Sequence, residues 1–360
     1  MGSTTRDRSL DGLRGLAALS VFVYHVWSHQ LGDTSRPDSD GLWSVIGSEM
    51  NLGLLLFFVL SGYLLYRGFV RHLREDRRPD LRRYLKRRAA RILPAYYVAI
   101  AGSIVLLWGS NIPGLNLPPA GDLPLFALFA QNYSPDTHQT LDPPTWTLCV
   151  EVGFYVLLPL LVVGLLRLHA GPGYQALMIG GLAAVGLLWD LGTYLGGADL
   201  IWQKMLPAWL PYFAAGMAVA LWYEYRPGQV RLGPGVTALG VLAGAALVVG
   251  NAAFKAQEIN TPAAHFIGDY PSGIGFALLI AMALVGAGPA TVWMRIRGLA
   301  GLGIVSYGFY LWHLPLILFL RGVHPEGGFL ATLALSAPLA LLLAWLSWRL
   351  VEQPALRRAA

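Results

Sequence analysis

The sequence predicts an all-α membrane protein that crosses the bilayer with about ten helices and carries no soluble domain. Of its 360 residues, 55% are hydrophobic and only 13% are charged, whereas a soluble domain has about 25% charged residues. Apolar runs long enough to cross a ~30 Å hydrocarbon core, which takes ~20 helical residues, recur along nearly the whole chain. The runs are continuous and lack the alternation of an outer-membrane strand, which favours helices over a barrel.

The predicted helices are these apolar runs, taken in chain order. The first carries Asp11, Arg14 and His25, so it is too polar and too long for a cleaved signal, and we expect it to stay as a helix. The ninth contains "GLGIVS" from Gly301, a pattern that favours close helix packing over a phosphate cradle. With ends defined to within a few residues, the ranges are 11–31, 52–70, 92–110, 145–168, 174–191, 205–224, 234–251, 271–288, 299–320 and 328–349.

Lysine and arginine predict how the chain is oriented in the cytoplasmic membrane. If both chain ends are cytoplasmic, the dense basic segment from Arg67 to Arg91 and most other basic residues fall on the cytoplasmic side. The few on the other side are Arg36, Lys204, Lys255 and Arg321. This is the positive-inside pattern, and an odd number of spans would break it. The net charge of +6 is then a topology signal beside anionic lipid and requires no nucleic acid.

Two connections differ from the rest. The cytoplasmic segment Arg71–Arg91 is strongly basic, whereas the outer segment Asn111–Pro144 has 34 residues, seven prolines and no Lys or Arg. A loop of that length in a compact protein is usually functional or disordered. Within it, Leu123–Tyr133 is too short to span the membrane, so we expect it to be interfacial or re-entrant.

The first predicted helix carries two ionisable side chains on one face. Arg14 and His25 are eleven positions apart, which is three turns plus ~20° and ~16 Å along the axis. Ionisable groups within the membrane are kept where they face a bundle interior or a wet cavity, so both are candidates for a functional site. Two purely structural roles stay open. In one, Arg14 extends to the inner headgroups and pairs with Asp11. In the other, His25 is a hydrogen-bonded core residue.

Polar side chains from four predicted helices come to about the same depth below the outer helix ends. They are His25, Ser61, Glu151 and His313. Ser306, Tyr310 and His313 follow i, i+4, i+7 spacing and share a face of their helix. A neutral histidine with a carboxylate that orients it or stabilises its charged form is a proton acceptor suited to a hydroxyl nucleophile, so we expect Glu151 to support His25.

Other kinds of site are disfavoured. Ser61 lies in V-L-S-G-Y and lacks the G-x-S-x-G pattern of a nucleophile elbow. His25 and His29 are spaced as metal ligands, but no third ligand joins them locally, and we predict no metal. Cys149 is the only cysteine, which excludes an intramolecular disulfide, and it points ~200° away from Glu151 on the same helix.

Several short motifs follow one another along the chain. They are R-x10-H within "LDGLRGLAALSVFVYH", then "GLLLFFVLSGYLLYR", "RRAARILPAYY", "WTLCVEVGFY", "SYGFYLWHLP" and "VEQP". Because these motifs occur in this order, the sequence resembles the acyltransferase-3 family of membrane enzymes. The resemblance covers residues 10–354 as one transmembrane domain and is to the minimal, standalone form of the family. One departure is Thr147, where the family pattern leads us to expect serine, and this change retains a hydroxyl.

The resemblance implies transfer of an acyl group from cytoplasmic acyl-CoA, acetyl-CoA above all, to a hydroxyl that is most often on a sugar. It implies that His25 is the catalytic histidine, that Arg14 is its companion and that Glu151 belongs to the catalytic set. Basic residues at the inner mouth would hold the CoA phosphates, and the candidates are Arg14, Arg67, Arg88 and Arg91. Candidates for stabilising the oxyanion or orienting the substrate are Ser61, Tyr310, His313, Ser306 and Trp146.

The acceptor and several rival functions stay open at this point. A cell-surface glycan, a lipid-linked sugar and a glycosylated natural product such as a macrolide all fit the resemblance, and no tightly bound cofactor is expected. A transporter with a His/Glu proton relay is the main rival, with helices broken at Pro94, Pro159 or Pro211 as its gates. A membrane acyltransferase of a different family with His313 as its base, and a scaffold protein, are two further rivals.

Overall fold

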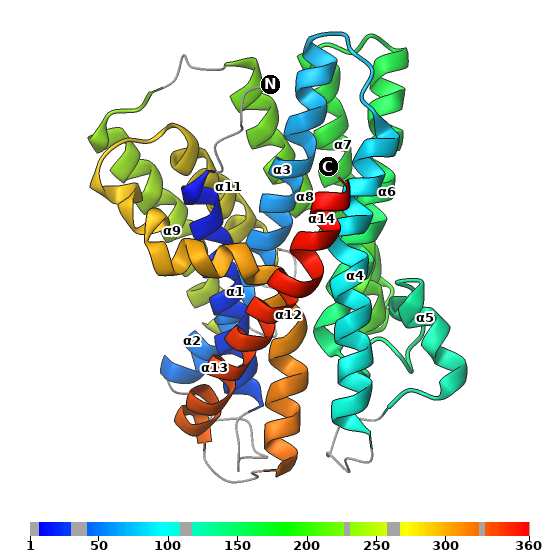
Figure 1. Cartoon of the computed structure of the whole chain (residues 1–360). Coiled ribbons are helices and arrows are strands. Elements are labelled where there is room, and N and C mark those ends of the chain that lie inside the picture. Colours follow the sequence, from blue (N-terminus) through cyan, green and yellow to red (C-terminus); the bar gives the residue numbers. More distant parts are fainter. Residues whose placement is uncertain are drawn as a thin grey trace.

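A computed structural model describes residues 7–29, 42–108, 117–226, 231–257, 267–323 and 328–359. In these ranges the regular structure is helical, apart from an isolated β-bridge between Leu232 and Gly286. The long helices form one bundle with α1 near its centre (Figure 1). The prediction of an all-α polytopic membrane protein is confirmed.

Each of the predicted apolar runs contains a helix. These helices are α1 (Arg8–Ser28), α3 (Gly53–Arg74), α4 (Leu81–Leu107), α6 (Trp146–Arg167), α7 (Pro172–Leu195), α8 (Leu206–Tyr225), α9 (Pro234–Gln257), α11 (Tyr270–Val285), α12 (Arg297–Val323) and α13 (Gly328–Ser347). Short helices outside the predicted spans are α2 (Leu42–Glu49), α5 (Leu123–Ala127), which lies in the segment expected to be interfacial or re-entrant, and α14 (Gln353–Ala359). The predicted ends at residues 30–31 and 109–110 lie outside the described residues.

Eight of the described helical segments are long and apolar enough to cross a membrane. Two of the predicted spans do not meet that standard. Helix α11 has only 16 residues, and α1 is made less apolar by Asp11, Arg14 and His25. Because α1 packs against α12 and α3, its polar side chains face protein rather than lipid, which is where such residues are tolerated in a membrane.

The largest error in a predicted boundary is at the start of α4. The helix begins at Leu81 rather than at residue 92, and Asp80 caps it by accepting a hydrogen bond from the Arg83 amide at 2.9 Å. Arginine and lysine are good helix formers but are not apolar. A search for apolar runs therefore misses the polar first turns of a helix that extends out of the membrane.

Glycines bring the helices around the site into close contact. A Cβ added at Gly303 of α12 would lie 1.8 Å from the Asp11 carbonyl oxygen of α1, and one at Gly15 would lie 2.0 Å from the Leu299 oxygen. Gly216 of α8 approaches α3 in the same way. Small residues let membrane helices approach closely, and this agrees with the interpretation of "GLGIVS" as a packing motif.

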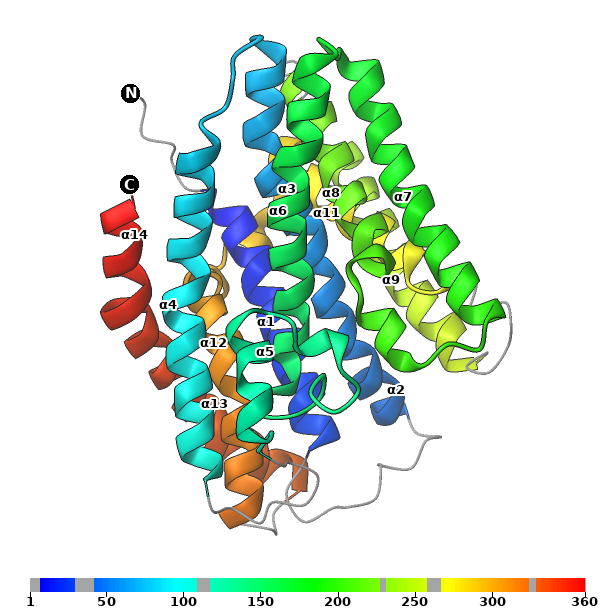
Figure 2. The same ribbon diagram turned by 90° about the vertical axis from the view of Figure 1, so that its right-hand side faces the viewer.

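The bundle has two distinct ends. The basic end is the one where α3 joins α4, and the loop end is the one covered by residues 117–145 (Figure 2). In the covering segment, Phe126 of α5 is buried, and its carbonyl accepts a hydrogen bond from Tyr96 at 2.8 Å. Asn132 donates hydrogen bonds to the carbonyls of Trp146 and Lys204, both at 2.8 Å. The segment is therefore folded onto the helix ends and does not span the bundle.

Candidate active site

His25 and His313 form a direct pair at the contact between α1 and α12. His25 Nδ1 lies 3.0 Å from His313 Nε2 and 2.9 Å from the carbonyl oxygen of Val21, one turn earlier. His313 Nδ1 lies 2.6 Å from the carbonyl oxygen of Tyr310. His313 is 1% exposed, so its ring is held on both sides by protein.

These contacts assign the protons of two neutral rings. A carbonyl oxygen only accepts hydrogen bonds, so His313 Nδ1 carries a proton and donates it to Tyr310. His313 Nε2 then has a lone pair, and His25 Nδ1 must be the donor both to it and to Val21. In a neutral imidazole one nitrogen donates and the other accepts. His25 Nε2 is consequently the nitrogen with a lone pair available for another partner.

His25 lines a cavity of about 510 Å³ at the loop end, which we call the loop-end cavity. Its polar lining includes Trp146 at the start of α6 and Lys204, whose Nζ lies 5.8 Å from the centre of the Trp146 ring. Gln139, Pro143 and Pro144 of the covering segment line it too. A mixture of aromatic rings and a few polar groups is typical of small-molecule sites.

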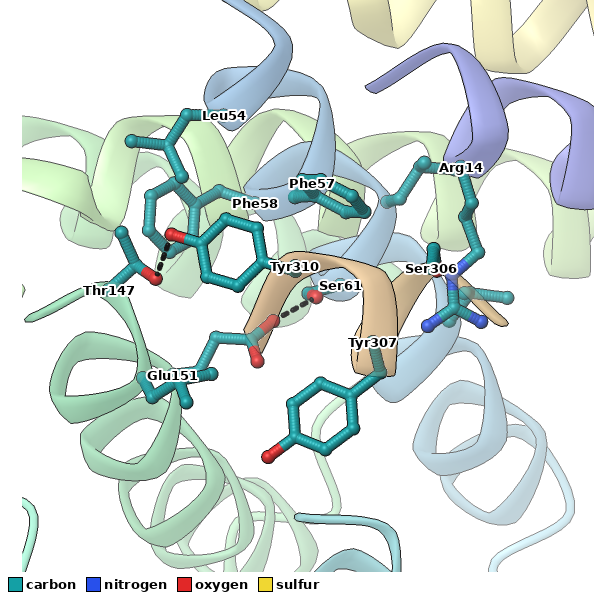
Figure 3. A pocket seen from close by; sticks show the side chains of 13 residues that line it. Arg14, Leu54, Phe57, Phe58, Ser61, Thr147, Glu151, Ser306, Tyr307 and Tyr310 are labelled. Carbon is teal, nitrogen blue, oxygen red and sulfur yellow. Dashed lines mark hydrogen bonds between the residues drawn. The ribbon is translucent and has the colours of Figure 1, made fainter. Parts of the chain in front are cut away.

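A second, central cavity of about 70 Å³ contains the predicted serine and carboxylate. Ser61 Oγ donates to Glu151 Oε1 at 2.7 Å, and the Tyr155 hydroxyl donates to Oε2 at 3.1 Å. The Arg14 guanidinium points into this cavity toward Ser306 (Figure 3). Each carboxylate oxygen of Glu151 thus has a donor, and a positive charge lies on the opposite wall.

Tyr310 separates the central cavity from the loop-end cavity and lines both. Its hydroxyl donates to the Pro144 carbonyl at 2.8 Å and lies 2.8 Å from Thr147 Oγ1. Thr147 Oγ1 is also 3.0 Å from the same carbonyl. The hydroxyl retained at position 147 therefore holds Tyr310 in place, together with the segment before α6.

A third cavity of about 290 Å³, the basic cavity, lies at the basic end. Its cationic lining comes from α4, through Arg83, Arg87 and Arg88. Arg88 is half-buried, and its Nε has no hydrogen-bond partner among the described residues. A buried guanidinium nitrogen without an acceptor is costly, so this site has the character of one completed by an anion.

The three cavities adjoin one another along α3. Leu54 lines both the loop-end and the central cavity, and Leu64 lines both the central and the basic cavity. These leucines are ten positions apart, which is about 15 Å along a helix. The row leads from arginines at the basic end, past Arg14 and Tyr310, to His25.

Some of the predicted relationships are corrected by this geometry. The four polar side chains expected to form one cluster belong to two pairs, His25 with His313 and Ser61 with Glu151. Depth along a helix axis says nothing about lateral position, so residues at one level need not meet. The direct support of His25 by Glu151 that we expected is not found, because Glu151 accepts hydrogen bonds from Ser61 and Tyr155, whereas the side chain hydrogen-bonded to the His25 ring is His313.

Two of the predicted CoA-binding arginines have protein partners. Arg67 Nε lies 2.5 Å from Glu224 Oε1, and Arg71 Nε lies 2.7 Å from Oε2 of the same carboxylate. Arg91 pairs with Glu352 at 3.2 Å, so the glutamate of "VEQP" joins α4. The role predicted for Arg67 and Arg91 stays a prediction, and these ion pairs indicate a structural contribution from both.

Sequence reasoning missed several residues at the site. Tyr155 follows Glu151 by one turn, a spacing that could have suggested the contact. Lys204, Gln139 and Arg321 line the loop-end cavity, and no spacing pattern connects them to His25. The described residues contain no group of three His, Cys, Asp or Glu side chains placed to hold a metal ion.

The fold and this row of cavities define a class of protein, a polytopic membrane protein with polar side chains in cavities between its helices. Residues 7–349 match the family model described as an acyltransferase domain. The chain therefore belongs to the acyltransferase-3 family.

Two groups of curated relatives are similar over most of the chain. The O-acetyltransferase OatA of Staphylococcus aureus is 25% identical over 96% of this chain and 56% of the relative. The peptidoglycan O-acetyltransferase OatA of Listeria monocytogenes is 25% identical over 86% of this chain and 49% of the relative. The chain thus spans about half the length of the relatives it matches. No solved structure matches it.

Proposed function

We propose that the protein is an O-acyltransferase that moves an acetyl group from cytoplasmic acetyl-CoA to a hydroxyl of a sugar-containing acceptor. The observation that carries the proposal is the row of three cavities, which runs from the arginines of α4 to His25. Membership in the acyltransferase-3 family and the O-acetyltransferase names of the relatives support it.

The basic cavity suits the nucleotide end of acetyl-CoA. Guanidinium groups bind phosphates with two parallel hydrogen bonds, and Arg83, Arg87 and Arg88 line this cavity. The ~15 Å between Leu64 and Leu54 is on the order of the length of the thin, uncharged pantetheine arm. Binding of the phosphates at the basic end would bring the thioester to Tyr310, where the central and loop-end cavities meet.

His25 acts as the general base in a direct transfer. Its Nε2 takes the proton of the acceptor hydroxyl while the hydroxyl oxygen bonds to the thioester carbonyl carbon. The tetrahedral intermediate then collapses, the carbon–sulfur bond breaks, and the CoA sulfur leaves with the proton that His25 returns. The products are an acetyl ester and CoA with a free thiol.

Neighbouring side chains support this step in different ways. His313 Nε2 accepts a hydrogen bond from the Nδ1–H group of His25. This hydrogen bond fixes the tautomer in which His25 Nε2 is the basic nitrogen. The Tyr310 hydroxyl is a donor at the place where the oxyanion forms, and moving its hydrogen bond from the Pro144 carbonyl to that oxygen would stabilise the intermediate. Arg14 supplies a fixed positive charge along the path of the donor.

The acceptor enters from the loop end, the side predicted to face away from the cytoplasm. The loop-end cavity of about 510 Å³ is large enough for a sugar residue, since ligand pockets start at about 300 Å³. One relative is named for acetylating peptidoglycan, which favours a glycan as the acceptor class. A lipid-linked sugar and a glycosylated macrolide belong in the same acceptor panel.

The direct test is an assay of the purified protein in nanodiscs. Isotope-labelled acetyl-CoA is supplied with the acceptor panel, and products are identified by mass spectrometry. We expect an acetyl ester with the wild-type protein and none with His25→Ala. His169→Asn is the matched control, because His169 is exposed, has a φ of +47° and tolerates asparagine. Wild-type turnover by His25→Ala, or proton-coupled flux without CoA, would contradict the proposal.

A further inference from the structure

A second polar cavity lies beside the loop-end cavity and has no part in the proposed reaction. It has a volume of about 330 Å³ and lies where α7 ends and α8 and α11 begin. We call it the side cavity. Its charged and aromatic lining residues are Asp190, Asp269, Lys255, Trp209, Tyr212 and Tyr270.

Two carboxylates in the side cavity are held in fixed positions. Asp190 Oδ2 accepts a hydrogen bond from the Tyr270 hydroxyl. Asp269 Oδ1 accepts one from Lys255 Nζ at 2.7 Å. An ionised carboxylate has about four acceptor sites, so one that already has protein partners can accept a further hydrogen bond from a sugar hydroxyl. The single ammonium leaves the lining with a net negative charge, which disfavours an anionic ligand.

Aromatic rings form much of the remaining wall. Tyr212 and Tyr270 are nearly parallel, with an angle of 19° and 6.0 Å between ring centres. The Trp209 ring lies 5.6 Å from that of Tyr212, and its Nε1 donates to the Gln203 carbonyl at 2.8 Å. Rings with fixed orientation beside carboxylates offer apolar faces and acceptors together. A sugar has the complementary surface, with C–H faces and hydroxyl edges.

The side cavity lies next to the loop-end cavity, and one pair of contacting rings lies between them. Trp209 lines the side cavity and Trp146 lines the loop-end cavity, and their ring centres are 5.1 Å apart. The neighbouring residues Gln203 and Lys204 divide in the same way, with Gln203 on the side cavity and Lys204 on the loop-end cavity. Adjacent residues of one saccharide could thus occupy the two cavities.

We infer that the side cavity binds a second sugar residue of an acceptor whose first sugar lies beside His25. This inference rests on the proposed function, because it takes the loop-end cavity as the acceptor site. It makes the acceptor an oligosaccharide or glycan chain rather than a lone sugar.

Binding and transfer test the inference separately. The probes are N-acetylglucosamine and its β-1,4 tetramer, and glucose and maltotetraose. Affinity is measured calorimetrically with the His25→Ala protein in nanodiscs, where no transfer occurs. We expect a tetramer of at least one series to bind at least tenfold more tightly than its monomer. Asp190→Asn should remove that difference, and Tyr270→Phe, which keeps the ring, should reduce it.

The control is Asp199→Asn, because Asp199 is exposed near the end of α7 and does not line the side cavity. Equal tetramer preference in the Asp190→Asn and Asp199→Asn proteins, or no preference in either series, would overturn the inference. If tetramers bind as expected but the wild-type protein acetylates no acceptor, the second binding site stands and the proposed function fails. If acetyl transfer occurs without any preference for tetramers, only the inference fails.

Discussion

His25 depends on a neighbour 288 positions away in the chain. The ring of His313 accepts a hydrogen bond from His25 Nδ1, and the Tyr310 carbonyl in turn accepts one from His313 Nδ1 and fixes that ring. The role parallels that of the residue that orients the base in a hydrolytic triad, although here a neutral ring replaces the carboxylate. A neutral partner avoids placing an unpaired charge inside the membrane.

Replacing His313 tests this positioning role. We expect His313→Ala to lower kcat by about 10²-fold, since a well-placed general base contributes 10²–10⁴-fold. His313→Gln keeps an acceptor oxygen and should recover part of the loss. The measurement is steady-state transfer with both variants beside His25→Ala. A His313→Ala protein without activity beside an active His25→Ala protein would identify His313 as the base and contradict the assignment.

Two arginines from the basic end separate donor binding from stability. Arg88 has a buried nitrogen without a partner among the described residues and lines the basic cavity, whereas Arg67 pairs with Glu224, which is buried. We expect Arg88→Gln to raise the KM for acetyl-CoA about tenfold at unchanged melting temperature, because one charged phosphate contact contributes about 1.5–3 kcal/mol. Arg67→Gln should instead lower the melting temperature, because the buried Glu224 carboxylate loses one of its cationic partners. If Arg67→Gln instead raised the KM and Arg88→Gln lowered the melting temperature, Arg67 would be the residue that binds the donor.

At the scale of elements, α1 and α12 must stay in close contact for the histidines to meet. We expect Gly303→Ala to destabilise the protein by about 1–3 kcal/mol, the usual range for overpacking, because its Cβ would collide with the Asp11 carbonyl oxygen. The shift between the helices should also reduce transfer. Gly301→Ala is the control, since a Cβ there meets no atom within 4 Å. Thermal melting of both variants checks this, and equal melting temperatures would contradict it.

The segment that covers the loop end contains a buried acid next to the site. Asp142 is fully buried, neither carboxyl oxygen has a hydrogen-bond partner among the described residues, and the preceding Leu141 has a φ of +60°. Burial raises the pKa of the Asp142 carboxyl well above its usual value of 3.8. A bulky residue with positive φ is strained, so the surrounding packing must stabilise this conformation.

The raised pKa of Asp142 gives a pH dependence with a definite sign. The folded state holds the proton more tightly than the unfolded state, so this group's stabilising contribution is complete below the unfolded pKa and is lost as pH rises toward the folded pKa. Asparagine at this position does not ionise, so the Asp142→Asn variant should not lose this stability as the pH rises. We expect its melting temperature to exceed that of the wild type by about 2 °C or more at pH 8, with little difference at pH 4. The exposed Asp136→Asn is the control, and an equal response from it would contradict the account.

For the whole molecule, the sequence predicted elements better than contacts. Apolar runs located the long helices, and the spacing of Arg14 and His25 placed both on the inward side of α1. The start of α4 was missed because its first turns are basic. The pairs His25–His313 and Ser61–Glu151 were not predicted, since helical period fixes which face a residue occupies but not which helix lies opposite.

The row of cavities is likewise a property of the assembled bundle. Leu54 and Leu64 are ordinary leucines in an apolar run, and nothing local distinguishes them from residues that face lipid. They border the cavities only because α3 packs beside α1 and α6 and shares the central cavity with α12. The loop-end lining combines α1, the covering segment and the turn before α8, a combination that depends on the tertiary fold.

The central claim is that acetyl-CoA binds with its phosphates at the basic end and its thioester beside His25. The most direct measurement is a cryo-electron microscopy structure of the His25→Ala protein in nanodiscs with acetyl-CoA. We predict phosphate density within hydrogen-bonding distance of Arg88 and continuous density along α3 from Leu64 to Leu54, ending next to Tyr310. Donor density outside this row, or side chains closed across the central cavity with CoA bound elsewhere, would contradict the account.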